Sequence, residues 1–277
     1  MIIRRLTTLD ECRQVAALEK AVWEFVDAED VIPPALLIVS IKRGGLLLGA
    51  FDDADILKGF VFSMPALKDG RPTHWSHMLA VTPDARSAGI GLRLKLAQRT
   101  QVMEAGVDLI EWTYDPLQAL NAHLNFARLG VVVEEYEENV YGDSSSPLHK
   151  GTPTDRFIAE WRLTAPHVER RLSAPQAPLL RDAAIMSAVL VNPSRPAGDW
   201  LEPGDPVADV IDGRRVLVEI PANFTEMQRD QPDLALEWRM ATRQIFHTYL
   251  NRGYRVVDFL FAREAGRGEY LLARKNL

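Results

Sequence analysis

A short apolar run that leads through a glycine-bearing turn into a long stretch of helix-forming residues constrains this chain more than any other feature. The apolar run covers residues 78–81, and the turn, Arg86–Gly91, opens roughly fifteen residues of good helix formers. A helix that begins in this way points several backbone N–H groups at an anion, at the positive end of the helix dipole. Glycine lets the backbone approach such a ligand closely, and Arg86 can add a charge-assisted contact. The segment therefore predicts a phosphate-binding turn.

This turn differs from two better known phosphate-binding patterns. Its six residues are Arg86, Ser87, Ala88, Gly89, Ile90 and Gly91. Two glycines are too few for the dinucleotide-binding fingerprint, and no Gly-Lys-Ser/Thr follows, as a P-loop requires. On spacing alone, an ordinary strand-to-helix turn fits the residues equally well.

The segments after the turn favour the ligand-binding interpretation. Gly106 ends the helix, residues 109–114 predict a strand, and residues 121–130 predict a helix with its own glycine stop. This order resembles the GNAT family of acyl-CoA-dependent N-acyltransferases, over roughly residues 1–163. In that family an Arg/Gln-x-x-Gly-x-Gly/Ala turn holds the pyrophosphate of coenzyme A, and a later helix lies against the pantetheine arm. The resemblance implies that acetyl-CoA or another acyl-CoA is the cosubstrate.

The first part of the chain has the order of elements that such a domain would have. Residues 2–6 predict a strand, and Thr8 or Asp10 can cap the helix after it. Further elements are expected as a helix over 33–43 and paired strands over 46–51 and 56–64. The expected fold class is α/β (α+β), with a GNAT-like mixed, mostly antiparallel sheet flanked by helices.

A change in composition marks the second part. Residues 164–206 hold seven of the 17 prolines, which predicts irregular structure and a domain boundary near 165. We expect an acyl-CoA-binding domain over 1–165 and a C-terminal α/β domain over 166–277. The latter has a strand over 215–220, a helix from about Asp233 and a strand over 256–261. This order fits a degenerate second GNAT-like half and an ordinary α/β arrangement equally well; we expect a single acyl-CoA site, in the N-terminal part.

Composition and charge exclude several classes of protein. A net charge of −6 and a pI near 5.6 argue against a general nucleic-acid binder. The one cysteine, Cys12, allows neither an intramolecular disulfide nor a multi-cysteine metal site, and no metal is expected. No apolar run reaches the length of a membrane span, and the N-terminus lacks the apolar core of a signal peptide. We expect a cytoplasmic protein without membrane or nucleic-acid partners. The sequence is compatible with a homodimer.

Acyl transfer to an amine requires a base and a donor to the developing oxyanion. In the GNAT family that donor is a backbone N–H of the strand before the turn, here at Leu79, Ala80 or Val81. His77 lies just upstream, with a reference pKa suited to proton transfer, but it fits a half-buried strand histidine as well. Glu111 is the rival base, because an acid in an apolar strand is costly without a task, unless it lies exposed at an edge.

The helix expected over residues 121–130 offers weaker candidates. His123 is a third possible base that can equally face solvent, and Asn121 and Asn125 can meet the pantetheine amides, although Asn121 is also a plausible N-cap. Many GNAT enzymes carry a tyrosine there as acid toward the departing thiolate, whereas this chain has Phe126. Tyr114 and Tyr141 are possible substitutes for it.

The sequence constrains the acceptor substrate less than it constrains the fold or the cosubstrate. Asp115 could hold an ammonium group, and Arg71, His74 or Arg156 a carboxylate, although such loop charges are usually solvated. The turn-rich residues 142–155 fit a mobile wall of the acceptor pocket or a plain hairpin connection.

A second resemblance bears on the acceptor. It rests on Tyr114-Asp115-Pro116-Leu117, Asn121-Ala122, Leu129-Gly130 and Thr154-Asp155-Arg156-Phe157, and is to a bacterial subgroup of two-part GNAT proteins. The resemblance implies transfer of an acetyl or succinyl group to a small-molecule primary amine, such as an amino acid. The alternatives are a non-catalytic acyl-CoA-binding regulatory protein and a protein-lysine acetyltransferase.

Overall fold

The computed structural model describes residues 1–142, 151–174, 188–204 and 213–274. These residues form two compact units. The first comprises Met1–Trp112 and Arg162–Thr164, and the second comprises the other described residues. The domain boundary expected near residue 165 from composition remains a prediction. Of the expected loop over 142–155, residues 143–150 lie outside the described part of the chain.

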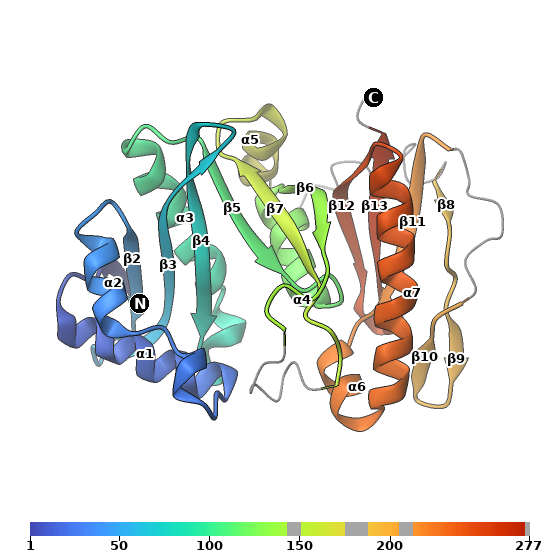
Figure 1. Cartoon of the computed structure of the whole chain (residues 1–277), viewed down its shortest axis with the longest axis horizontal. Helices are drawn as coiled ribbons and strands as arrows, with labels where there is room; N and C mark the ends of the chain where they lie inside the picture. The colour runs from blue at the N-terminus through green and yellow to red at the C-terminus, as the bar shows by residue number, and fades with distance from the viewer. Residues whose placement is uncertain (143–150, 175–187, 205–212, 275–277) are drawn as a thin grey trace. The chain divides into compact units, whose positions relative to one another are not determined.

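The first unit is a five-stranded sheet with helices against it. In chain order it contains β1 (Ile2–Arg5), α1 (Leu9–Trp23), η1 (Ala28–Asp30), α2 (Pro34–Ile41), β2 (Leu46–Phe51), β3 (Leu57–Lys68), β4 (Arg71–Val81), η2 (Pro83–Ala88), α3 (Ile90–Glu104) and β5 (Leu109–Tyr114), whose last two residues belong to the second unit. The strands lie side by side in the order β1-β2-β3-β4-β5, antiparallel except for the parallel pair β4–β5. Figure 1 shows this arrangement in blue to green.

The two faces of this sheet are covered by different helices. On one face an apolar cluster joins α1 and α2 to the strands; it includes Cys12, Val15, Leu37, Phe60 and Phe62, all fully buried. α3 packs on the other face through Ile90, Leu94 and Val102 (Figure 1). α1 begins where the sequence predicts, because the Thr8 side chain and Glu11 form a reciprocal capping box.

The second unit is also built on a sheet. Its elements are α4 (Ala119–Ala122), the π-helix η3 (His123–Leu129), β6 (Val132–Glu137), β7 (Arg156–Arg162), α5 (Pro166–Ser173), β8 (Val189–Leu190), β9 (Arg195–Ala197), β10 (Trp200–Glu202), β11 (Arg215–Pro221), α6 (Phe224–Asp230), α7 (Pro232–Asn251), β12 (Tyr254–Ala262), η4 (Arg263–Ala265) and β13 (Arg267–Arg274). Its strand order is β7-β6-β12-β13-β11-β8, antiparallel except for β11–β8, and β9 and β10 form a separate pair. α7 packs against β6, β11 and β12 (Figure 1).

The expected fold class is confirmed: the protein is mixed α+β, with mostly antiparallel sheet flanked by helices. Three expectations need correction. β4 begins at Arg71, well before residues 78–81, the apolar run from which this strand was predicted. The helix expected over 121–130 is a single α-helical turn followed by a π-helix. The proline-rich stretch contains the helix α5, which the sequence reading omitted along with β13. Whether the C-terminal part is a degenerate second half stays a prediction.

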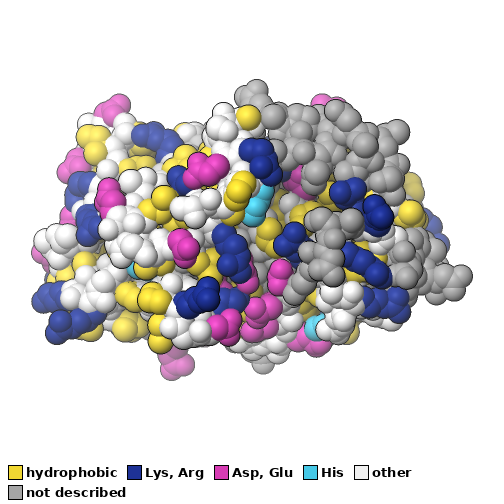
Figure 2. All heavy atoms as spheres, turned by 90° about the horizontal axis from the view of Figure 1, so that it is seen from above, with side chains coloured by type: hydrophobic (Ala, Val, Ile, Leu, Met, Phe, Trp, Pro, Cys, Tyr) yellow, Lys and Arg dark blue, Asp and Glu magenta, His cyan; other side chains and the backbone are white. Residues whose placement is uncertain are grey.

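The described residues carry charges of both signs on their surface. Figure 2 shows lysine and arginine side chains interspersed with aspartate and glutamate on the face that it presents. Among the residues that the structure describes, no helix combines the length and the apolar character needed to cross a bilayer.

Candidate functional site

A β-bulge interrupts β4 at His77. Phe62 of β3 pairs with Met78, but the next residue, Ser63, pairs with Ser76, so that His77 has no partner on β3. Because one extra residue reverses the alternation of side chains, Met78 faces the α1–α2 side while Ser76 faces α3. The bulge therefore places the neighbours His77 and Met78 on the same side of the sheet, a placement that the regular alternation of a strand would not reveal.

On its other edge β4 soon parts from β5. The parallel ladder in the described strands covers His74 with Ile110 and Trp75 with Glu111, and it goes no further. We call the place where the ladder ends the fork; Ser76 of β4 and Trp112 of β5 are the first residues beyond it. From the fork to Val81, the β5-facing edge of β4 is not used by the ladder, so its backbone groups can serve a ligand.

The predicted phosphate-binding turn follows β4 directly. η2 carries residues 83–88, and Gly89 then adopts φ +69°, a left-handed conformation that glycine reaches without strain, before α3 begins at Ile90. Gly89 has no side chain with which to cap α3, and a Cβ placed on it would meet open space. The first N–H groups of a helix lack intrahelical partners, so this end of α3 suits an anion.

Charges around the turn favour an anionic ligand. Arg86 is exposed, and its Nε lies 3.5 Å from the carbonyl oxygen of Val81. The nearby carboxylate of Asp84 is paired with Lys58 at 2.8 Å. The positive end of α3 and the guanidinium of Arg86 therefore act on a ligand without an unpaired carboxylate beside them.

His77 has the environment of a usable base. Its side chain is exposed, and its ring meets Phe62 edge-on at a centroid distance of 6.4 Å. Desolvation by the surrounding protein atoms lowers the pKa of His77 below its ordinary value of 6.5. The imidazole is therefore neutral at pH 7 and able to accept a proton.

Glu111 is committed to a partner. It is 6% exposed, and its Oε1 accepts a hydrogen bond from Lys68 Nζ at 2.9 Å. The interpretation of Glu111 as an exposed edge residue is therefore wrong, since it is a buried acid with a counter-ion. Through its pairing with Trp75 it faces the α1–α2 side of the sheet, as His77 does.

The two asparagines lie in the second unit. Asn121 is an exposed residue inside α4, whose N-cap is Gln118, so that its interpretation as an N-cap is wrong. Asn125 of η3 is 3% exposed, and its Nδ2 has no hydrogen-bond partner among the described residues. That unused donor matches a side chain that meets a ligand carbonyl, although the predicted contact with pantetheine stays a prediction.

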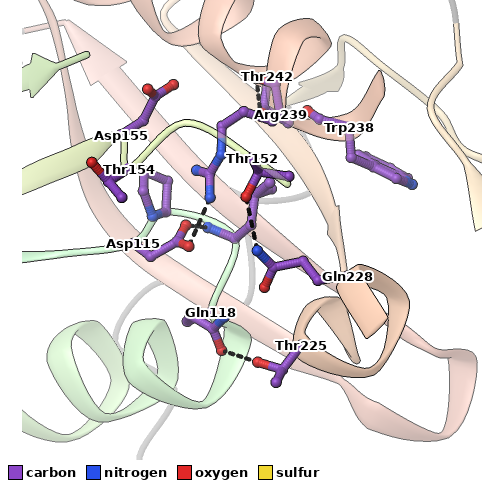
Figure 3. A network of polar contacts seen from close by, with 12 residues as sticks. Asp115, Gln118, Thr152, Thr154, Asp155, Thr225, Gln228, Trp238, Arg239 and Thr242 are labelled. Carbon is purple, nitrogen blue, oxygen red and sulfur yellow. Dashed lines mark hydrogen bonds and ion pairs between the residues drawn. The ribbon is translucent and has the colours of Figure 1, made fainter. Parts of the chain in front are cut away.

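Three residues considered for the acceptor are not solvated loop charges. His74 lies in β4, 5% exposed, with Ser63 Oγ 3.2 Å from its Nδ1, and burial lowers its pKa. Asp115 is 6% exposed and accepts hydrogen bonds from Arg239 Nη2 at 2.7 Å and from the Leu117 amide at 2.9 Å (Figure 3). Because Asp115 is held by an arginine, it is not free for an acceptor ammonium. Arg156 is buried as well, whereas Arg71 is exposed.

The tyrosines considered as acids are both engaged within the second unit. The hydroxyl of Tyr114 lies 3.5 Å from that of Tyr270, and burial raises the pKa of Tyr114. The hydroxyl of Tyr141 lies 2.8 Å from Thr113 Oγ1. Phe126 is fully buried, with its ring edge-on to that of Tyr270. His123 is half-buried beside the ring of Phe261, rather than facing solvent.

The sequence reading missed a buried polar group at the fork. Lys95 and Gln98 of α3 join Ser76 beneath the ring of Trp112, and none of the four is more than 6% exposed. A signal was available, because 95, 98 and 102 have the spacing of a single helix face and Val102 belongs to the core. Two polar residues on a buried helix face need partners, which only the fold identifies.

Solved structures of acetyltransferases are similar to part of this chain. A Desulfovibrio desulfuricans protein described as a GNAT-family acetyltransferase is 18% identical over 59% of this chain and 99% of its own, with a TM-score of 0.47. Aminoglycoside 6'-acetyltransferase type Ii is 19% identical over 60% and 99%, with a TM-score of 0.46. The yncA protein of Salmonella typhimurium, solved with acetyl-CoA, is 15% identical over 60% and 95%, with a TM-score of 0.46. No family model matches the chain, and neither does any of the curated proteins. Similarity at this level does not establish a family.

Proposed function

We propose that the protein is an acyl-CoA-dependent N-acyltransferase. The observation that carries the proposal is the continuity of three features: the fork, the bulged end of β4, and the open helix end at Gly89. An anionic diphosphate fits the end of α3, and an extended arm attached to it can follow the unused edge of β4 toward the fork. Acyl-CoA has this shape and charge. The alternative is a protein that binds acyl-CoA without turning it over.

His77 is the base of the proposed reaction. A neutral amine attacks the thioester carbonyl, so the acceptor ammonium must first lose a proton. The neutral imidazole of His77 can accept it, and backbone N–H groups of Leu79–Val81 can stabilise the oxyanion. Glu111 is less suited, because Lys68 already occupies its carboxylate.

The proposed acceptor is a small primary amine, such as an amino acid, and the acyl group is acetyl or succinyl. The resemblance of the Tyr114–Leu117 and Thr154–Phe157 segments supports this choice. A panel of amines, tested with acetyl-CoA and with succinyl-CoA for release of free thiol, measures both preferences. Tight binding of coenzyme A without turnover of any amine would favour the alternative function.

A substitution at Gly89 tests where the coenzyme binds. Gly89→Val places a branched side chain at φ +69° over the helix end, and we expect the affinity for coenzyme A to fall by about tenfold or more. Gly70→Val is the matched control, because Gly70 has φ +74°, open space around it, and a place in the turn between β3 and β4. Isothermal titration of both variants decides: an equal loss of affinity in both, or none in Gly89→Val, contradicts the proposed site.

A further inference from the structure

Lys95 is a buried cationic side chain surrounded by neutral groups. Its Nζ donates to Ser76 Oγ at 2.9 Å and to Gln98 Oε1 at 3.2 Å, and it lies 3.6 Å from the centroid of the Trp112 ring. The whole residue is 2% exposed. An ammonium group has three donors, and here they meet a hydroxyl, an amide oxygen and an aromatic face.

No carboxylate compensates this charge within the described residues. The ion pairs of the first unit involve other side chains, such as Lys58 with Asp84 and Lys68 with Glu111. Burial of an ammonium without a counter-ion is expensive, and a methionine of similar length would avoid that cost. A residue kept in such a state is a candidate for a role in which an anion appears beside it.

The position of Lys95 indicates which anion that is. Ser76 and Trp112, which it touches, are the first residues beyond the β4–β5 ladder, so the ammonium lies at the fork. It faces the α3 side of the sheet, the side on which the open helix end lies, whereas His77 faces the α1–α2 side. In the proposed reaction the acyl carbonyl lies at the fork, and the coenzyme's sulfur becomes a thiolate there.

We propose that Lys95 is the general acid that protonates the sulfur of coenzyme A as the thioester bond breaks. This inference rests on the proposed function. His77 passes the proton of the acceptor ammonium to solvent before attack. The amine nitrogen then forms the C–N bond and gives its second proton to the neutral His77, while the C–S bond breaks and its electron pair stays on sulfur. Lys95 transfers one proton to that sulfur, leaving the amide and free coenzyme A thiol. His77 then releases its proton to solvent, and the neutral Lys95 takes one up.

Two observations support this assignment. Burial lowers the pKa of Lys95 well below its ordinary value of 10.5, so that its ammonium gives up a proton more readily than that of an exposed lysine. A general acid must release its proton to the leaving group in the transition state, and this lowered pKa favours that release. The tyrosine hydroxyls of Tyr114 and Tyr141 are held by other residues, and Phe126 has none.

The test compares Lys95→Met, Lys95→Arg and the exposed-site control Lys42→Met in the full chain. Three quantities are measured for each: the affinity for coenzyme A, kcat against pH, and the pKa of the bound coenzyme thiol from the ultraviolet absorbance of the thiolate. We expect both Lys95 variants to bind coenzyme A within about threefold of wild type and to lose about 100-fold or more in kcat. The alkaline fall of kcat, which reports deprotonation of Lys95, should disappear in both.

The pKa of the bound coenzyme thiol distinguishes a failure of this proposal from a failure of the proposed function. Wild type and Lys42→Met should lower the thiol pKa relative to free coenzyme A, and Lys95→Met should abolish that shift. Failure of wild type to bind coenzyme A overturns the proposed function, and this proposal with it. Binding with an unshifted thiol pKa in wild type overturns the role of Lys95 alone. So does full activity in Lys95→Arg, whose guanidinium keeps the charge but cannot release a proton. If Lys95→Met does not fold, the wild-type thiol pKa and Lys95→Arg still decide.

Discussion

The two units differ in how many of their buried ionisable groups are held in ion pairs. In the second unit, buried carboxylates form ion pairs with arginines at 2.7 to 3.1 Å: Asp115 with Arg239, Asp155 with Arg243, Asp258 with Arg171 and Glu219 with Arg267. The first unit, in its described residues, pairs Glu111 with Lys68 but leaves other buried ionisable groups, such as Lys95 and Glu19, among neutral partners. Lys95 has a hydroxyl, an amide oxygen and a ring, and Glu19 has the backbone N–H of Ile32 at 3.2 Å.

This contrast separates structural charges from titrating ones. A paired buried charge keeps its ionisation state over a wide pH range and acts as a fixed cross-link between elements. When a buried ionisable group has no opposite charge beside it, its pKa shifts instead in the direction that favours its neutral form. Burial raises the pKa of Glu19 to about 7 and lowers that of Lys95. The first unit, which holds the proposed site of chemistry, thus carries buried groups whose pKa values burial shifts in favour of the neutral form.

Loss of an ion pair in the second unit should have the largest effect on stability. Arg239→Met leaves the Asp115 carboxylate buried and without its cation, and we expect the free energy of unfolding to fall by about 3 to 5 kcal/mol. Urea denaturation measures the change. Asp115→Asn combined with Arg239→Met removes the unpaired charge and should recover part of the loss. Equal losses in the single and double variants would show that Arg239 acts through packing against Phe224 rather than through its charge.

Removal of the unpaired acid in the first unit should have a smaller effect, with a definite pH dependence. The folded-state pKa of Glu19, about 7, lies above the ordinary glutamate value of 4.5. The folded state therefore binds more protons between these pH values, and it loses stability as the pH rises through that window. Glu19→Gln should therefore gain about 3 kcal/mol in unfolding free energy over wild type at pH 8, and almost nothing below pH 4.5.

Thermal unfolding at several pH values checks the Glu19 prediction. Glu29→Gln, which alters an exposed glutamate, serves as the control. A pH-independent difference between Glu19→Gln and wild type would mean that the carboxyl group does not titrate in this range.

The smallest expected effect concerns how two helices of the first unit begin. Thr8→Ala removes the cap of α1 and should cost about 1 kcal/mol in unfolding free energy, because the Thr8 hydroxyl accepts the Glu11 N–H. Thr7→Ala, one residue earlier, is the control, since the Thr7 side chain takes no part in the capping box. Neither change should affect coenzyme binding. An affinity loss in Thr8→Ala would break the distinction between a capped structural helix and the open end of α3.

Local pattern accounts for much of the fold and only part of the candidate site. The strand, the turn with Gly89 and the helix α3 were predictable, because each depends on residues that are neighbours in the chain. The capped start of α1 and the order β11, α7, β12 were predictable for the same reason. The π-helix at 123–129 was not, because the residues there also suit an α-helix and the choice depends on packing.

By itself the sequence determined the strand, turn and helix of the proposed diphosphate site, since glycine spacing, helix propensity and helix polarity act over a few residues. Only the tertiary structure decided which side chains surround the proposed site. The bulge at His77 reverses the faces of β4, and Lys95 is joined to Ser76 and Trp112 from two other elements. The partner of Asp115 lies 124 residues away. The state of a buried charge depends on groups distant in the chain, because its free energy is set by what replaces water around it.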